Sequence, residues 1–125
     1  MNRQDINILE TTTTADSGWM DISQFEDWSL FVDALESGSS IKVYGLFNVT
    51  APVTPSTQQG LPDVTTGAYL GTTLNGGGGP YMISDQSFLD SCSPPNQVKP
   101  HMLLVKKTQG GSPAETNVYM FSRKL

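Results

Sequence analysis

The stretch that decides the fold is WSLFVDAL-ESGSS-IKVYGLFNV, residues 28–49, where two apolar runs flank a short linker rich in serine. Alternate positions of the second run hold Ile41, Val43, Gly45, Phe47 and Val49. Because successive side chains of a β-strand point to opposite faces, this period of two predicts a long central strand. Val43 and Phe47 are expected on its buried face. The short linker predicts that the two runs pair as adjacent antiparallel strands.

Composition extends this local pattern to the whole chain. The 125 residues include 12 glycines and 8 prolines, and only 15% of them are charged. Such a composition favours many short strands joined by long turns, and the length suits a single core. We therefore predict an all-β fold, a jelly-roll-like β-sandwich of about eight antiparallel strands.

Four further segments contribute to this count. The runs 101–107 and 117–123 flank a segment rich in glycine and predict a terminal hairpin with a long loop. Residues 68–74 and 81–84 each suit a short strand. Asp85 is expected to cap a single helical turn that carries Phe88 and Leu89.

The first 16 residues are expected to form an extended arm before a sandwich domain over 17–125. Ile6, Ile8 and Leu9 are its apolar positions, and a threonine run follows at 11–14. The arm suits an edge strand or a strand added to a neighbouring subunit, with a frayed terminus as the alternative. We take Ile6, Ile8 and Leu9 as candidate partner-binding residues. Deletion of residues 1–12 is expected to leave the sandwich folded and to weaken attachment.

Residues 50–80 contain a long loop rich in proline, glycine and threonine. Proline does not fit a central strand, and loops of this length are usually functional or disordered. In a chain without catalytic motifs, a functional loop is expected to contact a partner.

Chemical motifs are sparse. His101 and Cys92 are the only histidine and cysteine, a set too small to predict a zinc site or a catalytic pair. The carboxylates follow no calcium-loop spacing, and Asn48 is a chance match to a glycosylation acceptor. We predict no cofactor and no enzymatic activity.

Charge and hydropathy exclude other classes. The net charge of −5 argues against a nucleic-acid partner, which needs clustered lysine and arginine. No apolar run approaches the roughly 20 residues that span a bilayer, and the N-terminus does not read as a signal peptide. Synthesis in the cytoplasm as a soluble product and no membrane partner are expected.

The aromatic residues leave two interpretations open. Rings on a sheet face stack on sugars, but more often they anchor a core or an interface. The candidates are Trp19, Trp28, Tyr44, Tyr69, Tyr81 and Tyr119.

Taken together, the threonine-rich arm, the two patterned strands at 28–35 and 41–49, the long loop and the ending over 118–123 resemble the small jelly-roll proteins of tailed-bacteriophage virions. Among these proteins, the chain resembles capsid decoration, or cement, proteins in particular. It implies a structural protein on the outer capsid surface, commonly a homotrimer, that binds the major capsid protein and stabilises the head. The alternative is a carbohydrate-binding or receptor-binding module of a phage tail or tail fibre.

Overall fold

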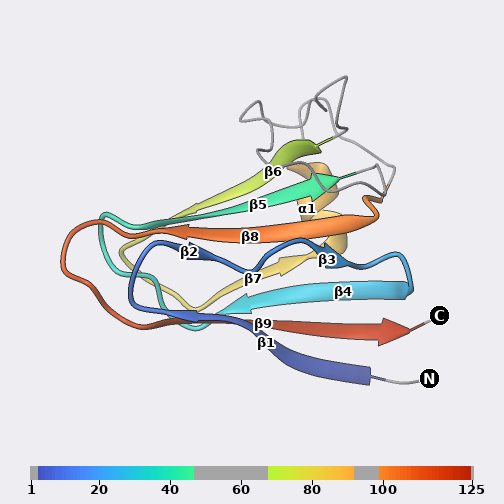
Figure 1. Ribbon diagram of the computed structural model, residues 1–125, viewed down its shortest axis with the longest axis horizontal. Helices are drawn as coiled ribbons and strands as arrows, with labels where there is room; N and C mark the ends of the chain where they lie inside the picture. Colours follow the sequence, from blue (N-terminus) through green and yellow to red (C-terminus); the bar gives the residue numbers. More distant parts are fainter. Residues whose placement is uncertain (1–2, 47–67, 92–98, 125) are drawn as a thin grey trace.

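The computed structural model describes residues 3–46, 68–91 and 99–124, which form two antiparallel sheets packed face to face (Figure 1). The predicted β-sandwich is confirmed, while the jelly-roll connectivity stays a prediction. The first sheet has the order β1 (Arg3–Thr11), β9 (Thr116–Lys124), β4 (Phe25–Val32), β7 (Tyr81–Ser84). The second sheet has the order β2 (Ala15–Asp16), β8 (Met102–Thr108), β5 (Ser40–Leu46), β6 (Ala68–Asn75), and β3 (Met20–Asp21) also pairs with β8.

Alternation along the strands fills the space between the sheets. In β4, Trp28, Leu30 and Val32 are buried while the residues between them are half-buried. Ile41 and Val43 of β5 meet them from the second sheet in one core cluster. The predicted burial of Val43 is thus confirmed, whereas Phe47 and Val49 lie outside the described residues.

The expected pairing of 28–35 with 41–49 is wrong. β4 belongs to the first sheet and hydrogen-bonds with β7 and β9, whereas β5 belongs to the second sheet and lies between β6 and β8. The connection over 33–39 therefore crosses from one sheet to the other. Each strand has one face on the common core, so crossing lets both bury that face without pairing with each other.

The predicted terminal hairpin is wrong for the same reason. β8 lies in the second sheet beside β5, and β9 lies in the first sheet between β1 and β4. Residues 109–115 form a second crossing, packed against the first. Gly110 is required there, because a Cβ on it would lie 2.3 Å from the carbonyl oxygen of Gly38.

A polar network joins the two crossings. The ammonium of Lys107 is fully buried and lies 2.8 Å from Glu36 Oε1. It also donates to the carbonyl of Ala114 and to Thr116 Oγ1, each at 2.9 Å. Ser39 Oγ donates to Glu36 and accepts from the backbone N–H of Gly110. Every hydrogen-bonding direction of the buried ammonium is therefore occupied by an acceptor.

This network should make stability depend on acid pH. Burial raises the pKa of Glu36, but hydrogen bonds from Lys107 and Ser39 outweigh it and hold the pKa below its ordinary 4.5. A lowered carboxyl pKa gives stability that is present above the unfolded value and lost as pH falls through the folded value. We expect urea unfolding midpoints to fall below about pH 4.5, and Glu36→Gln to flatten that dependence. An equally steep decline in the variant would contradict this role.

The helical turn is confirmed as α1 (Asp85–Asp90), but the capping residue is Ser84 rather than Asp85. Ser84 Oγ accepts from the N–H of Ser87, and Ser87 Oγ accepts in return from the N–H of Ser84. Phe88 and Leu89 point into the core as expected.

The first strand is part of the same sandwich. β1 pairs with β9 of its own chain from Arg3 to Thr11, with a bulge between Asn7 and Leu9, and so occupies the edge of the first sheet. Leu9 is 7% exposed and belongs to the core cluster. The chain then crosses to the second sheet, where β2 pairs with β8.

Deleting residues 1–12 should therefore destabilise the sandwich. The deletion removes the buried Leu9, worth roughly 1.5–3 kcal/mol, and uncovers the edge of β9. Chemical unfolding of the truncated and full chains measures the difference. An unchanged midpoint would show that β1 adds nothing to the fold and serves only as an arm.

Several expected features fall outside the described residues. These are Cys92, Asn48 and the part of the long loop over 50–67. The expected strand at 68–74 is confirmed as β6.

Candidate interaction face

The outward side of the first sheet carries an apolar patch. Residues directly opposite each other in an antiparallel ladder project to the same side. Phe31 of β4 is opposite Met82 of β7 and Tyr119 of β9, and Ser29 of β4 is opposite Phe121 of β9. The neighbouring buried residues on the same strands face the core, so these side chains face outward. We name Phe31, Met82, Tyr119 and Phe121 the apolar patch, and this side of the sheet the outer face.

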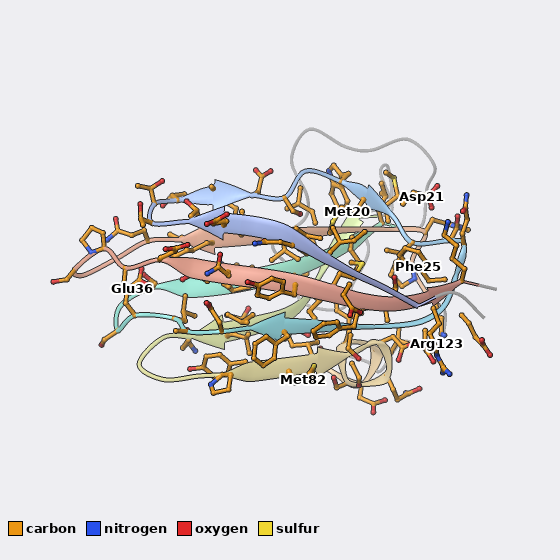
Figure 2. The ribbon with its side chains drawn as sticks, turned by 90° about the horizontal axis from the view of Figure 1, so that it is seen from below. Met20, Asp21, Phe25, Glu36, Met82 and Arg123 are labelled. Carbon is orange, nitrogen blue, oxygen red and sulfur yellow. The ribbon has the colours of Figure 1, made fainter. Side chains whose placement is uncertain are left out.

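Met82 is the most exposed member, with 59% of its surface accessible, and the three rings are half-buried. Figure 2 shows Met82 on β7, the strand at one edge of the first sheet. Contiguous exposed apolar surface usually marks a contact site. A flexible, polarizable thioether suits such a contact because it adapts to the opposing surface.

The rings of the patch do not form one plane. The centroids of Phe31 and Tyr119 lie 6.5 Å apart with planes tilted by 40°, and those of Phe31 and Phe121 lie 6.4 Å apart with a tilt of 49°. A flat platform for several sugar rings would need nearly coplanar faces. The tilted rings of the patch do not form such a platform.

One end of the outer face is polar and carries two ion pairs. A cleft of about 340 Å³ lies there, lined by Asp27, Trp28, Ser29, Asp85, Phe121, Ser122 and Arg123. The guanidinium of Arg123 makes a forked contact with Asp27, which holds the pKa of that carboxyl below its ordinary 3.8. Asp85 lies 3.3 Å from the ammonium of Lys99. Figure 2 places Arg123 at this end and Glu36 at the opposite end of the sandwich.

The other end of the outer face is acidic. Glu10 of β1 and Glu115 of the second crossing line an open groove of about 360 Å³ together with Thr11 and Thr12. The hydrogen bond with Glu115 and the repulsion of its charge raise the pKa of Glu10 above 4.5. The carboxylate of Asp33 also lies at this end. It accepts from the backbone and side-chain N–H groups of Asn117, the residue opposite Glu10 in the β1–β9 ladder.

The three residues that the sequence predicts to bind a partner differ in their exposure. Ile6 is 49% exposed at the edge of the first sheet. Ile8 is half-buried and packs against the core cluster, and Leu9 is a member of that cluster. Of the three, only Ile6 therefore leaves about half of its surface accessible to a partner.

The aromatic candidates also lie in different parts of the molecule. Trp28 is a core residue, and Tyr44 forms a small cluster on the second sheet with Leu70 and Leu104, against which Trp19 packs. Tyr119 alone among the six predicted rings belongs to the apolar patch. The Tyr69 side chain lies outside the described part.

Sequence reasoning missed Phe31, Met82 and Phe121. A signal was present, because the strands 28–32 and 118–121 carry apolar side chains in both phases of the alternation. A strand whose second phase faces water would carry polar residues there. Two apolar phases therefore indicate a strand covered on both sides.

The described residues offer little for chemistry. Within them, no group of three or more histidine, cysteine, aspartate or glutamate side chains is arranged to hold a metal ion. His101 is exposed. No helix in the described ranges has the length and apolar character needed to cross a membrane.

Comparisons with known proteins add no relatives. No protein-family model matches the chain, and neither a curated protein nor a solved structure matches it.

Proposed function

We propose that this protein is a structural virion protein of a bacteriophage, a capsid decoration protein that binds the major capsid protein through the outer face and stabilises the head. The observation that carries the proposal is the apolar patch, centred on Phe31 and including the 59% exposed Met82. An apolar centre with a polar rim is the usual anatomy of a protein–protein contact. The sandwich supplies a rigid support for it.

A modest patch is sufficient for this function. Decoration proteins bind in many copies, so a weak contact at each site is strengthened when copies are linked to one another. We propose a homotrimer as the linked form, because closed symmetric assembly is the common state of small subunits. Residence on the outer capsid surface follows from the same proposal.

The carbohydrate-binding alternative has less support from the geometry. The tilts of 40° and 49° between neighbouring rings break the continuity of a stacking surface. The measurement that separates the two functions is a glycan array, on which a decoration protein should remain unbound.

Replacing Met82 should weaken binding to heads while leaving the fold intact. Burial of a methionine side chain is worth roughly 1.5–3 kcal/mol, and each 1.4 kcal/mol is a factor of about ten in affinity. We therefore expect Met82→Ser to lower affinity for undecorated heads by about tenfold or more. Co-sedimentation with heads of the encoding phage, over a range of protein concentrations, measures the change.

Ile6→Ser is the matched control, because Ile6 is the other large apolar side chain that is highly exposed in the described residues. If the outer face makes the contact, Met82→Ser loses binding and Ile6→Ser retains it. The reverse pattern would assign attachment to β1 and contradict the role of the patch.

A further inference from the structure

The charges around the apolar patch are unevenly compensated. At the end that holds the cleft, Arg123 pairs with Asp27 and Lys99 pairs with Asp85. At the opposite end, Glu10 and Glu115 line one open groove, and neither takes part in an ion pair that the structure describes. The outer face therefore combines an apolar centre with one end that carries two ion pairs and one end where two glutamates lie together.

We propose that the occupant of the outer face is a different protein, one that presents an apolar surface flanked by arginine or lysine side chains, and not a second copy of this chain. The inference rests on the proposed function and specifies the chemistry of the partner. Complementary charge at the rim selects the partner and speeds encounter, while the apolar centre supplies most of the affinity.

A second copy that met the outer face with its own outer face is disfavoured. In a two-fold contact both subunits use the same surface, so the two acidic rims are brought into one interface. Each copy also carries a net charge of −5. Such an interface holds the Glu10 and Glu115 of both copies, and none of these carboxylates has a partner in an ion pair that the structure describes.

A head-to-tail contact is disfavoured by shape. The outward side of the second sheet does carry a basic pair, because Lys42 of β5 is opposite Lys106 of β8. The two outward sides lie on opposite faces of the sandwich, as Figure 1 shows. Contacts between opposite, roughly parallel faces repeat as an open stack and do not close into a ring. A closed trimer therefore does not form by contact between these two opposite faces.

Two synthetic peptides test the charge requirement, one cationic (RLFLR) and one anionic (ELFLE), both with blocked ends. Backbone amide shifts of Phe31, Met82 and Tyr119 report binding in the full-length protein. We expect the cationic peptide to bind at least ten times more tightly than the anionic one at low salt, and the difference to shrink at about 1 M salt, where screening extends to about 3 Å.

The paired substitution Glu10→Gln with Glu115→Gln should remove the preference. Asp16→Asn with Asp90→Asn removes the same charge from exposed sites away from the acidic end, and should retain it. Equal binding of both peptides to the native protein, or a preference unchanged by the paired glutamine substitution, would overturn the inference.

Sedimentation velocity tests the exclusion of a second copy. Met82→Ser should leave the oligomeric state unchanged. Conversion of an oligomer into a monomer by this substitution would show that a second copy occupies the outer face and would overturn the inference. Head binding is measured in a separate experiment. If Met82→Ser loses head binding but the native protein shows no preference for the cationic peptide, the decoration function is retained and only the basic partner is rejected.

Discussion

Replacing Glu36 with alanine should lower the free energy of unfolding by about 3–5 kcal/mol, because it leaves the ammonium of Lys107 buried without its counterion. Lys107 is fully buried, and Glu36 is its carboxylate partner at 2.8 Å. The carbonyl of Ala114 and the hydroxyl of Thr116 remain, but neither carries a charge. Urea unfolding at pH 7 measures the loss.

The double variant Glu36→Ala with Lys107→Met provides the control. Removing both charges eliminates the uncompensated ion, so the double variant should be more stable than Glu36→Ala alone. A loss below about 1 kcal/mol in Glu36→Ala would show that the pair acts like an exposed salt bridge and is not a buried one.

Replacing Phe88 with alanine should cost about 3–5 kcal/mol of stability, the range for removing a buried ring. Phe88 has no exposed surface and meets Trp28 edge to face with centroids 5.8 Å apart. Gly71 of β6 lies directly against the ring, since a Cβ there would be 2.0 Å from it. The helix α1 thus closes the core between the two sheets.

Gln86→Ala, on the exposed side of the same helix, serves as the control for Phe88→Ala. Surface substitutions of this kind usually change stability by less than about 0.5 kcal/mol. Similar losses in the two variants, measured by urea unfolding, would mean that helix formation and not ring burial determines the effect.

Strand identity could be predicted from the sequence because it depends on local alternation. The buried residues Trp28, Leu30 and Val32 repeat every second position, and Ile41 and Val43 do the same. The helical turn at Phe88 and Leu89 was predictable for a similar reason, since short polar residues precede an apolar pair. These features require no knowledge of distant contacts.

Strand pairing could not be predicted in the same way. A linker of 33–39 suits a hairpin and a crossing equally well, and alternation gives one buried face in both. What selects the crossing is contact with the other crossing over 109–115, through Glu36, Ser39 and Lys107. In the sequence Lys106 and Lys107 look alike, yet one is exposed and the other is fully buried.

The candidate site was only partly predictable. Ile6 and Leu9 have similar apolar character in the sequence, but the bulge in β1 directs Leu9 into the core while Ile6 lies at the exposed edge. The apolar patch forms from three strands that are distant in the sequence. The patch can be recognised only once β4, β7 and β9 are known to be neighbours in one sheet.

The central claim is that the outer face contacts the major capsid protein, and a photo-crosslinker placed at residue 82 tests it most directly. The matched position is Thr73, an exposed residue of β6 that lies opposite Lys42 on the second sheet. After assembly onto heads and irradiation, mass spectrometry identifies the crosslinked chain. We predict crosslinks from position 82 to the major capsid protein and none from position 73. Crosslinks to the capsid from position 73 alone, or crosslinks from position 82 only to other copies of this chain, would contradict the claim.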